Sequence, residues 1–220
     1  NLGPGDSRRN IMAQDVYELG SVFKIFTFTM ALEDHALKSL DEVFPIGQGF
    51  RIGRHVIHEA EHMPATLAAR DILAQSSNIG TSQIALRSGG LRERDFLAHL
   101  GLFKPVETDL PETARPLYPS TWGDIQTANV AFGQGIAVSP LSFVAAAASI
   151  VNGGRRITPT FLKQESRDLR GEQVIRPETS AKMRDLLRYV VTNGSGKKAD
   201  VPGYDVGGKT GSAQVAGPNG

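Results

Sequence analysis

The sequence has no cysteine, no excess of charge of one sign and no long apolar run. Without cysteine, disulfides, thiol nucleophiles, iron–sulfur clusters and zinc–cysteine sites are excluded, although the absence is compatible with an oxidising compartment. Lysine and arginine number 24 against 23 aspartates and glutamates, so the basic excess typical of a nucleic-acid-binding protein is missing. No apolar run approaches the roughly 18–20 residues that span a bilayer.

What remains is the composition of an ordinary globular protein. The 220 residues, 40% hydrophobic and 21% charged, suffice for one large domain or two small ones, and no linker divides them. Apolar periodicity and capping residues predict a helix-rich body with few strands. Helices are expected over 21–37, from a Thr66 N-cap to about 75, and over 79–87, 91–100, 140–151 and 177–193. An edge strand or loop is expected over 50–57, a proline-rich surface loop over 104–119 and a glycine-containing strand over 205–215.

The first candidate for chemistry is Ser21-Val22-Phe23-Lys24, at the start of a segment that is apolar on nearly every helix face. Positions i and i+3 share one face, and a helix N-terminus favours the negative charge that an activated serine develops. Burial disfavours an ammonium group, so we expect the pKa of Lys24 to fall until a neutral amine is available as a base. The pair therefore supplies a nucleophile and its activator, although an ordinary helix start with a solvent-reaching lysine has the same pattern.

Two further polar segments interrupt apolar ones. Residues 76–78 (Ser-Ser-Asn) separate two expected helices, where Ser76 would relay a proton and Asn78 would hydrogen-bond a substrate amide. Serine and asparagine clusters are equally common in caps and turns. Residues 209–212 (Lys-Thr-Gly-Ser) follow two glycines, and two hydroxyls one strand period apart beside a lysine suit a carboxylate. A plain β-hairpin strand with a glycine bulge is the alternative for that segment.

Together the three segments read S-x-x-K, S-x-N and K-T-G, in this order. This set resembles that of the serine-active penicillin-binding proteins and β-lactamases. Further segments resemble the class B penicillin-binding proteins, namely 17–21, 77–80, 132–141, 151–154 and 194–199. The residues before Ser139-Pro140 are closest to the division-associated (septal) branch of that class. The resemblance covers nearly all of residues 1–220.

The resemblance implies an α+β fold of the serine β-lactamase/transpeptidase kind, with an antiparallel sheet flanked by helices and an all-helical subdomain. In that family further strands and a closing helix follow the third motif, and strands also precede the nucleophile helix. Residues 1–220 are therefore expected to be one partial transpeptidase domain, without flanking strands, C-terminal helix, pedestal domain or membrane anchor. Weak or no activity is expected of such a piece alone, and the implied location is the periplasmic face of the inner membrane.

The activity that the resemblance implies is that of a peptidoglycan D,D-transpeptidase, which cross-links stem peptides in septal cell-wall synthesis through a serine acyl-enzyme. Ser21 attacks the carbonyl between two terminal D-alanines, and Lys24 accepts the hydroxyl proton. Ser76, with Lys209 nearby, passes a proton to the leaving D-alanine. The backbone N–H groups of Ser21 and Ser212 form the oxyanion hole.

Substrate binding is implied for the second and third motifs. Asn78 holds the peptide backbone, Thr210 and Ser212 bind the terminal carboxylate under the positive potential of Lys209, and Gly211 allows close backbone approach. Many class B members have threonine at the position of Ser212, and the hydroxyl preserves the role. The implied partners are stem peptides, β-lactam antibiotics and division-complex membrane proteins, with no cofactor and no nucleic acid.

Three alternatives stay open beside the transpeptidase. They are a serine β-lactamase, a D,D-carboxypeptidase, and a non-catalytic penicillin-binding sensor or scaffold module. A β-lactamase needs a base that activates water, and no Glu-x-x-Leu-Asn segment of the class A kind is present. The intact set of catalytic residue types argues against a module that has lost catalysis.

Residues 58–62 (His-Glu-Ala-Glu-His) also match H-E-x-x-H, a zinc motif that needs a helix so that both histidines share one face. The preceding residues alternate like a strand, and Pro64 disfavours helix at Met63. A solvated loop is the better interpretation, and no metal is expected. The glycines at 194–196 lack the spacing of a phosphate-binding loop, and those at 133–135 lack the third glycine of a dinucleotide site.

Overall fold

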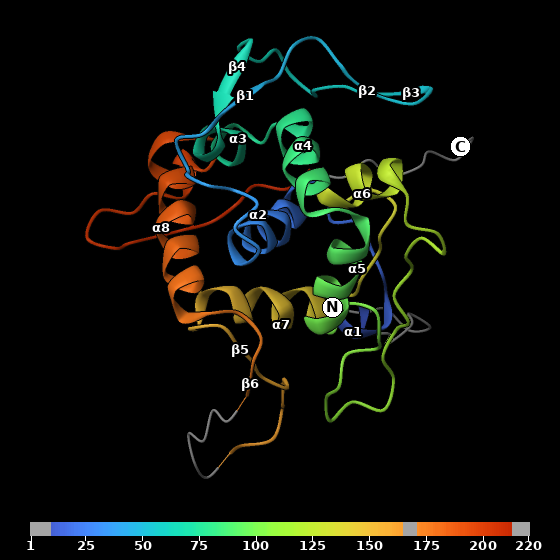
Figure 1. Cartoon of the computed structure of the whole chain (residues 1–220). Helices are drawn as coiled ribbons and strands as arrows, with labels where there is room; N and C mark the ends of the chain where they lie inside the picture. Colours follow the sequence, from blue (N-terminus) through green and yellow to red (C-terminus); the bar gives the residue numbers. More distant parts are fainter. Residues whose placement is uncertain (1–9, 165–170, 213–220) are drawn as a thin grey trace, which may run out of the picture.

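The computed structural model describes residues 10–164 and 171–212, which form a helical body from which short strand pairs project (Figure 1). The α-helices are α1 (Ile11–Gln14), α2 (Lys24–Glu33), α3 (Ala69–Gln75), α4 (Asn78–Ser88), α5 (Gly90–His99), α6 (Asp124–Ala131), α7 (Pro140–Val151) and α8 (Pro177–Asn193). The 3₁₀ helices are η1 (Gly20–Phe23) and η2 (Lys197–Ala199). The strands are β1 (Val43–Pro45), β2 (Phe50–Ile52), β3 (His55–Ile57), β4 (Thr66–Ala68), β5 (Arg155–Arg156) and β6 (Glu172–Gln173).

Helix α2 lies at the centre of the body, with α4, α5, α7 and α8 packed around it (Figure 1). Its residues from Lys24 to Ala31 are all buried, as the apolar pattern predicts. The ends differ from the predicted span of 21–37. At the N-terminal end, Gly20 has a φ of 56° and begins the 3₁₀ helix η1, which replaces the first turn of the predicted α-helix. At the C-terminal end, His35 also has a φ of 56°, and α2 ends before it.

The prediction that Thr66 caps a helix is wrong. Thr66 begins β4, which pairs antiparallel with β1 and places the buried Leu67 opposite the buried Phe44. Helix α3 starts only at Ala69, which directly follows the strand. Because β1 is distant in sequence, the local capping pattern around Thr66 could not reveal this pairing.

Helices α4, α5, α7 and α8 confirm the predicted spans to within a residue or two. The start of α7 has the expected cap, because Ser139 Oγ accepts a hydrogen bond from Ser142 N–H at 3.1 Å and Pro140 occupies the first turn. Helix α6 was not predicted, since its residues carry little apolar periodicity. It packs against α4 and α5 (Figure 1), and so completes the wall of a cleft described below.

Among the residues that the structure describes, the strands form three antiparallel pairs, β1–β4, β2–β3 and β5–β6. The α+β class is confirmed, and the alternating residues 50–57 form the β2–β3 hairpin with Phe50 opposite Ile57. The strand predicted over 205–215 is not formed within 205–212, and 213–215 lie outside the described residues. Instead, Gly208 N–H donates to the Leu187 carbonyl of α8 at 3.1 Å, so a helix holds this segment where a neighbouring strand was expected.

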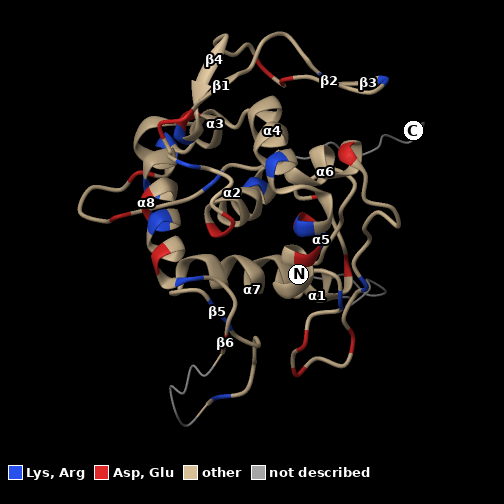
Figure 2. Ribbon diagram, viewed as in Figure 1, with Lys and Arg blue, Asp and Glu red and all other residues tan. Residues whose placement is uncertain are grey.

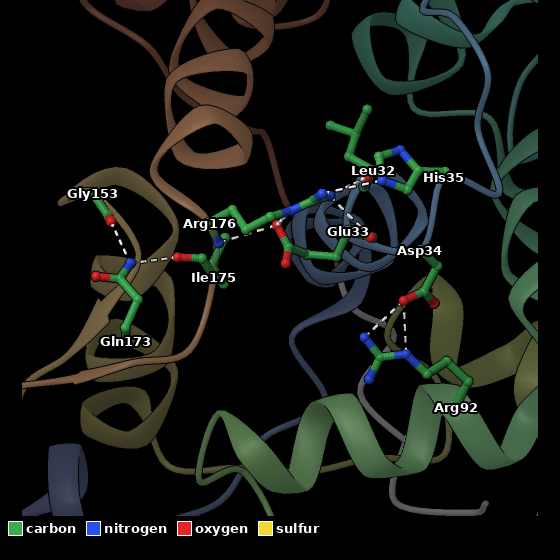
Figure 3. A network of polar contacts seen from close by, with 9 residues as sticks. All are labelled: Leu32, Glu33, Asp34, His35, Arg92, Gly153, Gln173, Ile175 and Arg176. Carbon is green, nitrogen blue, oxygen red and sulfur yellow. Dashed lines mark hydrogen bonds and ion pairs between the residues drawn. The ribbon is translucent and has the colours of Figure 1, made fainter.

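Arg176, directly before α8, ties that helix to the end of α2 (Figure 3). Its guanidinium donates to the carbonyls of Leu32 and Glu33 at 3.1 and 2.9 Å, and it also contacts the Glu33 carboxylate at 3.3 Å. A cation at a helix C-terminus satisfies carbonyls that have no partner within the helix. Asp34 pairs with Arg92 of α5 at 2.7 Å, so the end of α2 opposite the first motif is fixed from two sides.

Charges of both signs alternate along the same elements, notably α5 and α8, as the balanced composition leads one to expect (Figure 2). Within residues 10–164 and 171–212, no helix combines the length and the apolar character that crossing a membrane requires.

Candidate active site

Ser21 is half-buried in η1, at a turn against which a glycine loop is packed. Gly133, at a φ of 86°, lies so close that a Cβ on it would overlap the carbonyl oxygen of Gly20. Only glycine permits both that backbone conformation and that approach. The loop after α6 therefore fixes the position of the peptide unit that enters Ser21.

Two further contacts join the same segments. Tyr17 and Val138 exchange backbone hydrogen bonds of 3.0 and 3.1 Å, and the Gly135 N–H donates to the Glu18 carboxylate at 2.9 Å. Residues 17–21 and 132–141, which the resemblance singled out separately, thus lie side by side.

Lys24 occupies the first turn of α2 and is 0% exposed. Its Nζ donates to Ser76 Oγ at 3.0 Å and to Asn78 Oδ1 at 2.8 Å, and it also contacts the Ser76 carbonyl. The pKa of Lys24 is lowered from 10.5 to about 7, mainly by burial and also by the positive charge of Lys209, while the Glu59 carboxylate acts in the opposite direction. The expected fall of this pKa is confirmed, with burial as its main cause.

Ser76 lies between α3 and α4 in a left-handed conformation with a φ of 64°. A non-glycine residue in this region is strained and marks a position that its surroundings hold in place. Its Oγ accepts hydrogen bonds from Lys24 Nζ at 3.0 Å and from Lys209 Nζ at 2.9 Å. Because both amines donate to this oxygen, neither of them accepts the hydroxyl proton of Ser76, which is left to be donated to a third group.

The third motif reaches the same hydroxyl through Lys209. Burial lowers the pKa of Lys209 from 10.5 to about 8. Its Nζ also donates to the Thr210 carbonyl at 2.9 Å and to Thr210 Oγ1 at 3.3 Å. Thr210 Oγ1 lies 2.9 Å from Ser195 Oγ, which brings in the segment 194–199 as well.

Gly211 brings the third motif against the turn that contains Ser21. A Cβ on Gly211 would lie 2.6 Å from Cγ1 of Val22 and 3.3 Å from the Leu19 carbonyl oxygen. Thr210, Gly211 and Ser212 are exposed, so their polar groups are open to a ligand. The absence of a side chain at Gly211 is what allows this residue to lie against Leu19 and Val22, which flank the turn at Ser21.

Asn78 lines a cleft of about 450 Å³. The cleft is bounded by β3, by α4, by α6 and by the loop that follows α6. Its lining residues are His55, Val56, Ile57, His58, Asn78, Ile125, Gln126, Asn129, Phe132 and Gln134. Side-chain amides and imidazoles on these walls suit a polar, peptide-like ligand that passes Asn78.

The structure brings together Lys24, Ser76, Asn78 and Lys209 through direct hydrogen bonds. Ser21 lies three residues before Lys24 but is not part of this network. Within the described residues Lys24 Nζ donates to the second motif and not to Ser21 Oγ.

Sequence reasoning missed Glu59, which it placed in a solvated loop. The carboxylate is half-buried and accepts hydrogen bonds from Ser77 Oγ at 2.5 Å, Asn78 N at 2.8 Å and Ile79 N at 3.0 Å. Residues 58–62 form no helix, so the match to H-E-x-x-H lacks its geometry. The sequence signal that could have indicated this role is the start of α4. Its first backbone N–H groups have no acceptor within the helix and need one from another segment.

Comparison with known proteins agrees with this geometry. The family model of the penicillin binding protein transpeptidase domain matches residues 3–220. The chain is 38% identical over 218 residues to the probable peptidoglycan D,D-transpeptidase FtsI of Caulobacter vibrioides, and the aligned region covers 97% of this chain and 37% of that protein. It is 31% identical over 228 residues to the stage V sporulation protein D of Bacillus subtilis, covering 97% and 35%. The chain thus spans little more than a third of these relatives.

Solved structures show the same fold. The apo TP domain of Burkholderia pseudomallei penicillin-binding protein 3 matches with a TM-score of 0.87 and 30% identity, over 96% of this chain and 65% of that one. Penicillin binding protein 3 of Mycobacterium tuberculosis, complexed with aztreonam, matches with a TM-score of 0.87 and 29% identity, over 97% and 52%. With its three motifs converging on Ser76 and its match to the family along residues 3–220, this chain belongs to the penicillin-binding protein transpeptidase family.

Proposed function

We propose that this chain is the acyl-transfer part of a peptidoglycan D,D-transpeptidase, with Ser21 as its nucleophile. The observation that carries the proposal is the convergence on Ser76 Oγ, which accepts from Lys24 of the first motif and Lys209 of the third. The three motifs are far apart in the sequence. Two amines on one hydroxyl, that of the buried Lys24 and that of the half-buried Lys209, suit proton transfer during covalent catalysis, and the half-buried Ser21 lies three residues before Lys24.

In the first half of the reaction, Ser21 Oγ bonds to the carbonyl carbon between the two terminal D-alanines, and Lys24 takes the hydroxyl proton. With a pKa of about 7, about half of Lys24 is neutral at pH 7, against about three in ten thousand at an ordinary lysine pKa. For this step Nζ exchanges one of its acceptors in the second motif for Ser21 Oγ, and catalytic hydrogen bonds often tighten only once substrate binds.

In the second half, the carbon–nitrogen bond to the terminal D-alanine breaks, and its nitrogen needs a proton. Ser76 donates that proton and regains one from Lys24 or Lys209, both of which hydrogen-bond to its oxygen. The amine of a second stem peptide then attacks the acyl-enzyme carbonyl and gives a proton to the neutral Lys24. The bond from that carbonyl to Ser21 Oγ breaks, and Lys24 returns the proton to Ser21 Oγ. No metal or cofactor takes part in this scheme.

Substrate binding is proposed for the exposed edge of the site. The backbone N–H groups of Ser21 and Ser212, which meet no acceptor within 10–164 or 171–212, are the proposed oxyanion hole. Thr210 and Ser212 offer hydroxyls to the terminal carboxylate beside the Lys209 ammonium. Asn78 presents its amide to the peptide backbone at the cleft.

The biological setting is proposed from the relatives. Several are named peptidoglycan D,D-transpeptidases or penicillin-binding proteins, and the match to the Caulobacter FtsI supports a septal role. We propose stem peptides as substrates and β-lactams as acylating inhibitors, the periplasmic face of the inner membrane as the location, and division-complex membrane proteins as partners. Residues 1–220 are proposed to be part of one transpeptidase domain.

Labelling with a fluorescent penicillin tests the proposal, on the purified protein that carries these residues. The wild type is expected to form a stable fluorescent adduct, and Ser21→Ala is expected to form none. Rapid multiple turnover of nitrocefin would instead indicate a β-lactamase. Release of D-alanine without cross-linking, when an acceptor amine is supplied, would indicate a carboxypeptidase, and absence of any adduct would leave a non-catalytic module.

A further inference from the structure

Glu59 lies on the loop after the β2–β3 hairpin, outside the three motifs, yet it contacts the second motif directly. One carboxylate oxygen accepts from Ser77 Oγ at 2.5 Å and Ile79 N at 3.0 Å, and the other accepts from Asn78 N at 2.8 Å. Three consecutive residues after Ser76 therefore donate to one carboxylate. Hydrogen bonds to an ionised acceptor are about twice as strong as those between neutral groups.

These contacts stabilise the backbone conformation of residues 76–79, which is strained at Ser76. Ser76 has a left-handed backbone conformation with a φ of 64°, which is strained for a non-glycine residue and persists only when neighbours enforce it. Ser77 is 0% exposed, and its Oγ, which donates to Glu59, accepts in turn from Gly80 N at 2.9 Å. Glu59 thus supplies the acceptor that the N-terminal turn of α4 needs from outside the helix.

The same loop also orients the amide of Asn78. Its Nδ2 donates to the His58 carbonyl at 3.4 Å, its backbone N–H donates to Glu59, and its Oδ1 faces Lys24 Nζ at 2.8 Å. The loop 58–59 therefore determines where Asn78 and Ser76 meet Lys24.

We propose that Glu59 is a positioning residue for the acyl transfer, which holds the Ser76–Asn78 turn in register with Lys24 and Lys209. The inference rests on the proposed function of Ser21. Glu59 does not touch the reacting atoms and acts through Ser76, Asn78 and Lys24.

A second consequence concerns charge. Two charged groups act on the Lys24 amine: Lys209 lowers its pKa and Glu59 raises it. Removing the carboxylate charge without removing the side chain should lower the pKa of Lys24, so that neutral amine persists to lower pH. A residue that only stabilised the fold would not move the pH profile of acylation in this way.

The test is the pH dependence of the second-order acylation rate by a fluorescent penicillin, in the purified protein that carries these residues. Glu59→Gln is expected to lower the rate on the order of tenfold, because an amide nitrogen then faces N–H donors, and to shift the acidic limb to lower pH. Glu59→Asp keeps the charge, so its limb should stay at the wild-type position while its shorter side chain lowers the rate. Glu61→Gln, a matched change at an exposed carboxylate two residues away, should change neither.

The outcomes separate the inference from the function on which it rests. A wild type without an adduct at Ser21 refutes the proposed function. If the wild type is acylated but Glu59→Gln behaves as Glu61→Gln does, or loses rate only in proportion to folded protein with its acidic limb unmoved, the positioning role is refuted. Should Glu59→Gln not fold, Glu59→Asp decides. An acylation rate per folded protein equal to that of the wild type overturns the inference, and a lowered rate per folded protein with an unmoved limb supports it.

Discussion

Replacing Lys209 with glutamine is expected to raise the pKa of Lys24 and so to move the pH profile of acylation. The positive charge of Lys209 is one of the causes that lower the Lys24 pKa to about 7. Glutamine removes that charge and retains an amide that can donate to Ser76. In the proposed mechanism only the neutral amine of Lys24 accepts the Ser21 proton, so the acidic limb of the profile should report this pKa directly.

The expected size of the effect follows from the geometry. Both amines donate to Ser76 Oγ, at 3.0 and 2.9 Å, so the two nitrogens lie at most about 6 Å apart. At that distance two unit charges repel by about 0.7 kcal/mol in water-like surroundings and by about 3 kcal/mol at an effective dielectric constant of about 20. These energies correspond to a rise of the Lys24 pKa by about 0.5 to 2.

The assay is the second-order rate of acylation by a fluorescent penicillin, measured across pH. The wild-type rate should rise with a midpoint of about pH 7, and the midpoint for Lys209→Gln should lie between about 7.5 and 9. Lys198→Gln, at an exposed lysine of η2, is the matched control and should leave the midpoint in place. A midpoint for Lys209→Gln that stays at the wild-type value, or falls, would refute the assignment of Lys24 as the base.

Two predictions concern stability. Glu93 of α5 is 2% exposed, and burial raises its pKa to about 8 although Trp122 Nε1 donates to it at 3.0 Å. The folded state therefore binds a proton that the unfolded state releases above about pH 4.5, so stability should fall by on the order of 3 kcal/mol from about pH 4.5 to 7. Glu93→Gln should remove this loss. If the free energy of unfolding of Glu93→Gln differs from that of the wild type by the same amount at about pH 4.5 and at pH 7, the prediction is wrong. Gly133 has a positive φ, and a Cβ there would overlap Gly20, so Gly133→Ala should lower both the unfolding temperature and the acylation rate. Gly135→Ala is the control, because Gly135 has a φ of 74° and open space around its Cα, and its effects should be smaller. Equal effects of the two variants would count against the close approach of Gly133 to Gly20.

Much of the site could be predicted because its residues sit in short local patterns. The spacing of Ser21 and Lys24 and the apolar residues after them predict a buried amine, and the structure confirms both the burial and the lowered pKa of Lys24. The cap at Ser139 was similarly local, since a serine before a proline identifies a helix start without knowledge of the rest of the chain.

What could not be predicted depends on contacts between distant segments. Thr66 has the side chain of a helix cap, but its strand partner β1 lies in another part of the chain. Glu59 stands in a charged stretch that reads as solvated, and its role is visible only once α4 is placed beside it. Residues 205–212 have a strand-like composition, yet within the described chain they contact α8 and η1 and pair with no strand.

The central claim is that Ser21 becomes acylated, and mass spectrometry tests it most directly. After treatment with benzylpenicillin, the intact protein should gain the mass of one penicillin, and digestion should place the adduct on the peptide that contains Ser21. Ser21→Ala should gain no mass under the same conditions. An adduct that maps to another residue, or that persists in Ser21→Ala, contradicts the account.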